Sequence, residues 1–278
     1  MRYTKILKPL PLFIAAAVFI TACSAPAAEL LDGPIVAEMK NGQKSGDKTF
    51  DHSEYDALLK KHVDIDSGRV DYAGFKSDEA KLDAYLKTIA EANMKELGGD
   101  EQHALLINAY NAYTVKLILE NYPLDSIRDI SDPWKTERYV VTSHKLSLDN
   151  IEHNLIRPFF KDPRIHFAVN CAAKDCPPLR PTAYTGAKLD KQLDEATRAV
   201  LSSSQFVRVE SDRLHVTKLF DWYGDDFVNK EFKGHAPNAA RYIARYTTDE
   251  VREFIESKNN DPTIRFLDYD WSLNDTAR

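Results

Sequence analysis

Several features that would assign a protein class at once are missing from this chain of 278 residues. It has no phosphate-binding loop, no dinucleotide-binding fingerprint and no haem motif, so no organic cofactor is expected. It has no internal repeat and no basic stripe, and its net charge of −6 makes nucleic acid a poor partner. Hydrophobic residues make up 43% and charged residues 29%, which is typical of a soluble globular protein rather than a coiled coil, a collagen or a polytopic membrane protein.

The first 23 residues have the pattern of an export signal. Arg2, Lys5 and Lys8 make a positive start, and residues 10–20 form an apolar run that is too short to span a bilayer. The run ends in Ile-Thr-Ala-Cys, which resembles the bacterial lipobox, so we expect Cys23 to become a lipidated first residue. Cleavage there removes three basic residues and no acid, which makes the remaining chain more negative.

A lipid on Cys23 would anchor the chain to a membrane. Ser24 follows in place of an aspartate, and by resemblance to other lipoproteins this favours the outer membrane of a Gram-negative cell, with the protein facing the periplasm. Ordinary cleavage after residues 25–27, Ala-Pro-Ala, is the alternative and would release a soluble periplasmic protein. Residues 24–48 are rich in Ala, Pro, Gly, Lys and Asp and predict a flexible linker, so that 49–278 form one globular domain.

The pattern beyond this linker combines helices with a few short strands. Apolar residues at helical spacing predict helices over 51–62, from 77 onward and over 101–121, where Pro123 ends the last one. Short strands are expected over 138–142, 145–148, 206–209, 214–216 and 263–268. These elements indicate an α/β or α+β fold, with a single mostly helical domain packed on a small sheet.

The helix predicted over 101–121 carries two amides, Asn108 and Asn111, which share one face because they are three residues apart. The helix is apolar on most sides and is expected to lie in the core. A buried amide without a partner costs about 1–3 kcal/mol, so both side chains need hydrogen bonds. Either they bind neighbouring backbone and fix the packing, or one of them lines a substrate site.

A short helix is expected over 149–156, and its side chains can be placed around the axis at about 100° per residue. Glu152 lies at the edge of the apolar stripe, whereas His153 faces nearly the opposite way. Glu152 is therefore the better candidate for pointing inward, where a carboxylate needs a cation or a hydrogen-bond donor. Arg157 and Arg164 are near enough in the sequence to be its partners.

Residues 162–178 hold His166, Cys171 and Cys176 and are where we expect the chemistry. Apolar residues lead up to the cysteines and two prolines follow, which predicts a buried strand with a thiol at its end. Strand alternation puts His166 and Asn170 on one face and Cys171 on the other, so a His166–Cys171 pair needs a bulge or the strand end. A base from another element is the alternative.

Four roles are open for the two thiols. Cys171 is a nucleophile activated by a histidine, or it pairs with Cys176 as a disulfide in an oxidising compartment. Both could instead bind Zn²⁺ with His166 or His153, although two cysteines separated by four residues are a loose zinc motif, and we expect no metal. Finally, both could be inert and buried.

Several motifs occur together in an order that resembles the domain-of-unknown-function family 547. They are Ile-Asn-Ala-Tyr-Asn-Ala at 107–112, Ile-Glu-His at 151–153, Asp-Pro-Arg-Ile-His-Phe-Ala at 162–168, the stretch 171–179, and Phe-Asp-Trp-Tyr at 220–223 with Asp-Phe at 226–227. The similarity runs from about 51 to 274.

The resemblance implies that Glu152, His153, His166 and Cys171 belong to the family pattern. Relatives can carry Ser at the position of Cys176, which favours Cys171 as a nucleophile over an obligatory disulfide. Many relatives have an aliphatic residue at position 170, where this chain has an asparagine that could modify the site or cap the strand. A likeness to thiol peptidases and transglutaminase-like enzymes is an analogy at the level of the fold.

These observations lead to one functional hypothesis and one alternative. The hypothesis is an envelope lipoprotein with a cysteine-centred hydrolase or acyl-transfer site, in which Cys171 attacks, His166 or His153 is the base and Glu152 orients that base. The substrate would be a small molecule or a peptide, with contacts from Asn108, Asn111 and Asn170. The alternative is a non-catalytic binding domain of the envelope with a structural Cys171–Cys176 pair. The sequence predicts no oligomeric state.

Overall fold

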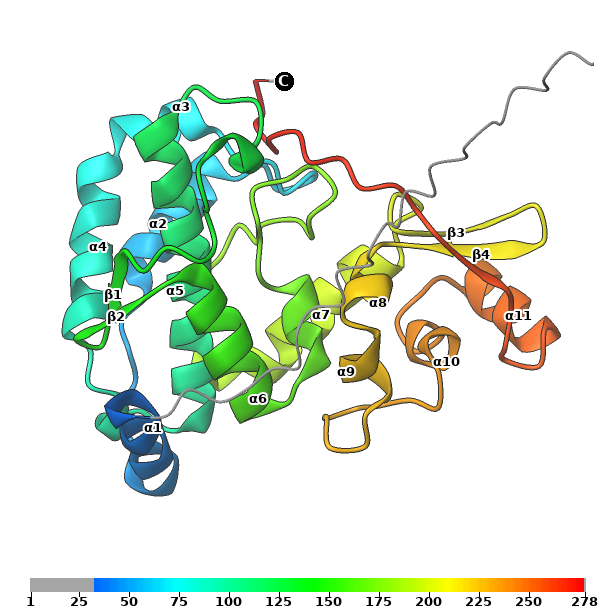
Figure 1. Cartoon of the computed structure of the whole chain (residues 1–278), viewed down its shortest axis with the longest axis horizontal. Coiled ribbons are helices and arrows are strands. Elements are labelled where there is room, and N and C mark those ends of the chain that lie inside the picture. Colours follow the sequence, from blue (N-terminus) through cyan, green and yellow to red (C-terminus); the bar gives the residue numbers. More distant parts are fainter. Residues whose placement is uncertain (1–32, 278) are drawn as a thin grey trace, which may run out of the picture.

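Helix α5 (Gly99–Asn121) is the axis of the larger part of the molecule, with α2 (Ser53–His62), α3 (Tyr72–Ser77) and α4 (Glu79–Glu91) beside it (Figure 1). This computed structural model describes residues 33–277. Every residue of α5 from position 102 to 115 is buried, as expected for a helix that is apolar on most sides. The predicted core helix over 101–121 is thus confirmed.

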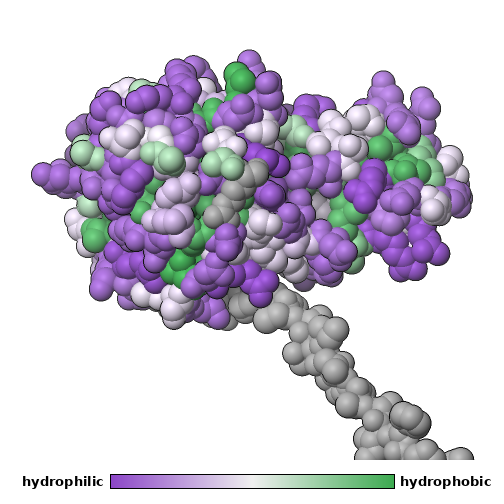
Figure 2. Space-filling view, turned by 90° about the horizontal axis from the view of Figure 1, so that it is seen from above, coloured by the Kyte–Doolittle hydropathy of each residue, from purple (hydrophilic) through white to green (hydrophobic). Residues whose placement is uncertain are grey.

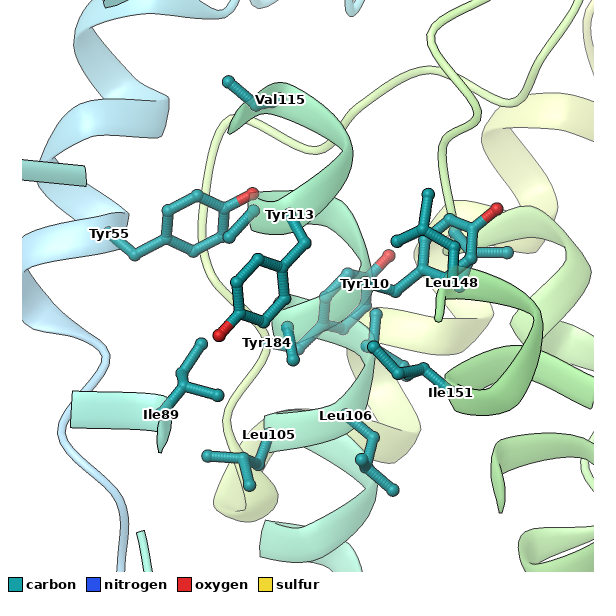
Figure 3. Packing of buried hydrophobic residues seen from close by; sticks show 14 of the residues in the cluster. Tyr55, Ile89, Leu105, Leu106, Tyr110, Tyr113, Val115, Leu148, Ile151 and Tyr184 are labelled. Carbon is teal, nitrogen blue, oxygen red and sulfur yellow. The ribbon is translucent and has the colours of Figure 1, made fainter. Parts of the chain in front are cut away.

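Side chains pack against α5 on two sides, and each side has both aromatic and aliphatic residues (Figure 3). Tyr113 points toward Ile89 of α4, with Tyr55 of α2 nearby. Tyr110 lies on the other side, toward Leu148. The helix therefore joins the N-terminal helices to the segment that leads to the cysteines.

Helix α1 (Pro34–Ser45) occupies much of the segment that the sequence predicted as a flexible linker, so that prediction is wrong for these residues. Ile35, Val36 and Met39 are buried, and Nε2 of Gln102 in α5 donates to the carbonyl oxygen of Met39 at 3.0 Å. Positions 35, 36 and 39 have helical spacing and a proline suits the first turn, but polar and small residues dominate the composition. The export signal over 1–23, the lipidation at Cys23 and the remainder of the linker up to residue 32 lie outside the described residues.

Two small antiparallel hairpins make this an α+β fold. β1 (Tyr139–Val141) pairs with β2 (His144–Leu146), and β3 (Val207–Glu210) pairs with β4 (Arg213–Val216). β5 (Ile264–Phe266) adds to β4 in parallel, giving the order β3-β4-β5. All five strands were predicted, with ends that differ by at most two residues.

The hydrophobic core falls into two clusters, one around α5 and one in the C-terminal half. The second is centred on Phe227, whose ring lies 4.4 Å from Phe220, 4.8 Å from Tyr242 and 5.7 Å from Phe167. Its helices are α7 (Leu189–Leu201), α8 (Leu219–Trp222), α9 (Gly224–Val228), α10 (Ala239–Ile243) and α11 (Asp249–Ser257). The short 3₁₀ turns η1 (Met94–Glu96), η2 (Ile127–Asp129) and η5 (Gly186–Lys188) lie in connections elsewhere in the chain.

After β5 the chain crosses back to the side of α5 (Figure 1). Backbone hydrogen bonds secure this last segment: the N–H of Leu273 donates to Asp125 at 2.8 Å, and that of Asn274 to Ala172 at 3.1 Å. The N–H of Val70 donates to the carbonyl of Asn274 at 2.9 Å. The C-terminal segment is therefore held against the loop that carries the cysteines.

The surface seen in Figure 2 is mostly hydrophilic, with small hydrophobic areas. The large apolar residues with high exposure are single and scattered along the chain, which is normal for a folded protein: Ile65, Val140, Val228 and Phe266. In the part of the chain that the structure describes, no helix is long and apolar enough to cross a bilayer.

Candidate functional site

The segment that carries the cysteines is a 3₁₀ turn followed by a loop, so the predicted buried strand is wrong. The turn η4 (Pro163–Phe167) is capped by the side chain of Asp162, and its first residue is a proline, which needs no hydrogen-bond partner there. The apolar residues of the segment pack against both core clusters, which suits a buried turn as well as a strand. The alternation argument that separated His166 from Cys171 therefore does not apply.

Two buried asparagines shape the loop. Asn111 of α5 donates from Nδ2 to the carbonyl of Ala168 (3.0 Å) and accepts the N–H of Asn170 on Oδ1 (2.8 Å). The Asn170 side chain donates to the carbonyl of Pro177 (2.7 Å) and accepts the N–H of Ala172 (2.9 Å). The second bond helps to hold Ala172 at φ 62°, a backbone state that residues with a Cβ rarely adopt. Both amides are engaged with backbone, so we assign them positioning roles in place of the predicted substrate contacts.

Asn108 acts at a different place. Its Nδ2 donates to the carbonyl of Tyr184 at 2.8 Å, and its Oδ1 accepts the N–H of Tyr184 at 3.0 Å. Nδ2 also lies 3.2 Å from Nδ1 of His52. Asn108 therefore does not lie in a site with Cys171, as had been expected. Of the two predicted roles for this amide, the one that fits is binding to neighbouring backbone, which fixes the packing.

A cavity of about 280 Å³ lies where the two clusters meet, and Cys171 borders it. Tyr110 of α5 and His166 of η4 also line it, as do Glu152 and His153 of the short helix η3 (Asn150–Ile156). Half of the other lining residues are aromatic: Trp134, Trp222, Tyr223, Tyr269 and Trp271. The four residues predicted as catalytic thus border one cavity, and they come from two segments, η3 and the turn and loop over 162–178.

The thiol of Cys171 has two close neighbours. Its Sγ lies 2.8 Å from Sγ of Cys176 and 3.3 Å from Oη of Tyr269, and its N–H donates to Sγ of Cys176 at 2.8 Å. Both cysteines are free thiols. Among the hydrogen bonds of the described residues, none joins Cys171 to an imidazole. Catalytic hydrogen bonds are often longer in a free protein than in its substrate complex.

The two thiols differ in acidity. The hydrogen bond with Cys176 lowers the pKa of the Cys171 thiol below its ordinary value, although burial opposes it, and the hydroxyl of Tyr269 adds to the lowering. Burial raises the pKa of Cys176 well above its ordinary value. Cys171 is therefore the thiol of the pair that ionises first, and a thiolate is the nucleophilic form.

His166 is held by Asp226, a residue that we had not singled out as part of the site. Nε2 of His166 lies 2.8 Å from Oδ2 of Asp226, and the imidazole stacks on Tyr223 with 4.1 Å between ring centres. Arg157 donates to the same carboxylate from Nε (2.8 Å) and Nη2 (3.1 Å). Burial would raise the pKa of Asp226, but His166 and Arg157 outweigh it and lower the pKa to about 2.

These contacts fix the tautomer of His166. The ionised carboxylate of Asp226 can only accept, so Nε2 of the imidazole carries the hydrogen and Nδ1 has the lone pair. Nδ1 is buried and has no hydrogen-bond partner in the described part of the chain. Burial lowers the pKa of His166 below its ordinary value, which keeps the ring neutral near pH 7. His166 therefore carries a basic nitrogen that is free to take a proton.

The short helix η3 is a π-helix, and its wider turn changes which side chains share a face. Glu152 is buried, as predicted, but His153 also lines the cavity, so the prediction that it points away is wrong. Nδ1 of His153 lies 3.2 Å from Nη1 of Arg157 and 3.8 Å from Oε1 of Glu152. Because a guanidinium can only donate, Nδ1 of His153 accepts this bond and is occupied. Arg157 pairs with Asp226 and not, as predicted, with Glu152.

Arg164, the other predicted partner of Glu152, binds Asp162 through Nη2 at 2.7 Å. The carboxylate that contacts the imidazole of His166 is that of Asp226, which lies 60 residues from His166 in the sequence, and not that of Glu152. The available signal was the Asp-Phe motif at 226–227, one of the motifs on which the resemblance in the sequence rests. Within residues 33–277, no group of three or more His, Cys, Asp and Glu side chains is arranged to hold a metal ion.

Comparison with known proteins finds one family model that matches part of the chain. Residues 94–201 match the family described as "Protein of unknown function, DUF547". This confirms the resemblance over a segment that covers less than half of the chain but contains α5, η3 and both cysteines. Asp226 and Tyr269 lie outside the matched segment. No curated protein and no solved structure matches the chain.

Proposed function

We propose that this protein is a cysteine-dependent hydrolase or acyl transferase in which Cys171 is the nucleophile and His166 the base. One observation carries the proposal: Cys171, the more acidic thiol of a close pair, shares a cavity with a neutral histidine, and Nε2 of that histidine is bound by a buried carboxylate. A nucleophile, a base and a group that orients the base are the parts that acyl transfer requires. Asp226 takes the orienting role.

The reaction balances with these groups alone. Nδ1 of His166 takes the thiol proton of Cys171 as the sulfur bonds to the carbonyl carbon of an ester or amide. The C–O or C–N bond then breaks, and the leaving alcohol or amine receives the proton from His166. Water next gives its proton to His166 and its oxygen to the acyl carbon, and the C–S bond breaks as the sulfur regains a proton. In acyl transfer an alcohol or amine takes the place of water.

His166 is a better base than His153 for a specific reason. Nδ1 of His153 accepts from Arg157, and its Nε2 lies 3.9 Å from Oδ1 of Asp149. Nδ1 of His153 is therefore occupied, whereas Nδ1 of His166 has no hydrogen-bond partner among residues 33–277. Glu152 contributes negative charge to the cavity, beside His153.

The test uses p-nitrophenyl acetate with the full chain. We expect a burst of p-nitrophenol equal to the enzyme concentration, and an acetyl group on Cys171 found by mass spectrometry. Cys171→Ser should abolish the burst, and His166→Gln should slow it by about 10²-fold or more. Cys176→Ser is the matched control at the second sulfur and should still form the acyl-enzyme. A burst that survives in Cys171→Ser would refute the proposal.

The alternative function is a binding domain in which Cys171 and Cys176 are joined as a disulfide. It is favoured by the Sγ–Sγ distance of 2.8 Å, which is short enough that a small shift would close the bond. Counting free thiols in protein isolated from the cell envelope separates the two functions. Two alkylatable thiols, with Cys171 reacting first, support the enzyme; no reactive thiol before reduction supports the binding domain.

We also propose that the chain is exported and anchored to the outer membrane through a lipid on Cys23, facing the periplasm. The support is the charge and hydropathy pattern of residues 1–23 and the lipobox-like end of that pattern. Labelling cells with a radioactive or clickable fatty acid should mark the wild-type chain but not Cys23→Ala. Label in Cys23→Ala would contradict lipidation at Cys23. Absence of label from the wild type would favour the soluble periplasmic form.

A further inference from the structure

All three tryptophans of the chain line the cavity that contains Cys171. They come from distant segments: Trp134 precedes β1, Trp222 lies on α8, and Trp271 is in the C-terminal segment. The ring of Trp271 lies 5.8 Å from that of Trp134 and 5.9 Å from that of Trp222. Tyr269 fits between them, at 4.9 Å from Trp222 and 4.6 Å from Trp271. The fold thus brings four aromatic rings together on one side of the cavity that Cys171 also lines.

The same cavity is acidic. Glu152 and Asp149 line it, whereas none of its described lining residues is a lysine or an arginine. Two guanidinium groups lie over rings of the cavity: that of Arg157 is 5.0 Å from the ring of Tyr223 and is committed to Asp226 by two hydrogen bonds, and that of Arg128 is 5.4 Å from the ring of Trp271. Nδ1 of His153 accepts a hydrogen bond from Arg157. The side chain of Glu152 is buried, and its Oε1 lies 3.8 Å from Nδ1 of His153.

We propose that this aromatic and acidic cavity binds an organic cation, and that the substrate is an acyl ester or amide of a small amino alcohol or amine with an alkylammonium group. Aromatic faces attract ammonium groups through their quadrupole, and a buried carboxylate adds to this attraction. A volume of about 280 Å³ is at the small end for ligand sites and fits a small metabolite, not a folded protein chain. The acyl part of this inference rests on the proposed function of Cys171.

A pair of matched probes tests the cation directly. Choline carries a trimethylammonium group, and 3,3-dimethylbutan-1-ol has the same shape with carbon in place of the charged nitrogen. Because every tryptophan borders the cavity, quenching of the intrinsic fluorescence of the full chain reports binding without any catalysis. We expect choline to bind about tenfold more tightly than its neutral isostere, as measured by fluorescence and by calorimetry.

Two variants and their control assign the effect to residues. Glu152→Gln and Trp222→Leu should each weaken the binding of choline several-fold. In Glu152→Gln the binding of the neutral isostere should stay nearly unchanged. Asp221→Asn is the matched control, because Asp221 is an exposed acid next to Trp222 that does not line the cavity. Equal binding of the two probes, tighter binding of the neutral one, or no choline binding at millimolar concentration would overturn the inference.

The outcome is independent of the catalytic proposal. Choline binding should persist in Cys171→Ser, where the acetyl burst is lost. A protein that forms the acyl-enzyme but binds both probes equally would keep the proposed function and reject the cation site. A protein that prefers choline but never acylates Cys171 would keep the cation site and reject the enzyme.

Discussion

His166 donates from Nε2 to Oδ2 of Asp226 across 2.8 Å, deep between the two core clusters. Arg157 holds the same carboxylate, and all three side chains are buried. The guanidinium balances the charge of Asp226, so the histidine can remain neutral while its ring is oriented. The bond therefore links the stability of the fold to the protonation state of the site.

Replacing Asp226 by asparagine should destabilise the protein strongly. The guanidinium of Arg157 would remain buried without a counter-ion, and removing one member of a buried pair costs about 3–5 kcal/mol. Urea denaturation gives the change in unfolding free energy. The neighbouring Asp225→Asn, at an exposed position, should change it by less than about 0.5 kcal/mol. Similar losses in the two variants would contradict the role of the pair.

The same carboxylate predicts an acid-sensitive step in stability. Its folded pKa of about 2 lies below the ordinary value of 3.8, so the ionised form is favoured in the folded state. This contribution is complete above pH 4 and is lost as the pH falls from about 4 to about 2, by about 2 kcal/mol. Unfolding free energies at pH 5 and pH 2.5 measure it. The drop should be smaller in Asp226→Asn, and an equal drop there would assign it to other groups.

Asn111 and Asn108 form a matched pair for testing how the thiol loop is positioned. Changing either to leucine leaves buried backbone groups unpaired, and each variant should lose about 1–3 kcal/mol of stability. Only Asn111 binds the loop that leads to Cys171, so only Asn111→Leu should slow alkylation of Cys171 by iodoacetamide. Equal rates in the two variants would show that the amide acts on stability alone.

Cys176 should control the acidity of Cys171. Cys176→Ala removes the hydrogen bond that lowers the pKa of the Cys171 thiol, so that pKa should rise toward its ordinary value. The pH profile of iodoacetamide labelling should then shift to higher pH, with a slower rate at pH 7. Tyr269→Phe should shift the profile in the same direction by less. An unchanged profile in Cys176→Ala would remove the thiol pair from the activation of Cys171.

Helix α1 should behave as part of the folded domain. Met39 is fully buried, and Met39→Ala should cost about 2–5 kcal/mol in unfolding free energy. Lys40, the next residue, is exposed, and Lys40→Ala should leave the stability within about 0.5 kcal/mol of the wild type. If the two variants have equal stability, the helix does not contribute to the core.

Local sequence signals predicted those parts of the fold that depend on neighbouring residues. The periodicity of the segment around Asn108 identified the buried helix α5, and alternation with turn residues located the hairpins and β5 to within two residues. The motifs around Glu152, His166 and Cys171 identified three residues that line one cavity. The predictions of α5 and of the strands succeeded because helical and strand patterns record which side of a short element faces the core.

Tertiary structure decided the rest, because it depends on contacts between segments that the chain does not place side by side. The turn that replaced the expected strand is apolar because two core clusters cover it, and this burial gives the same pattern as a strand. The π-helix η3, which lets the side chains of Glu152 and His153 line the same cavity, has no marker in residue spacing. Asp226 reaches His166 over 60 residues, and Tyr269 reaches Cys171 over 98. The sequence alone therefore determined which residue types are present for chemistry, whereas the packing of distant segments decided which atoms meet and which thiol ionises first.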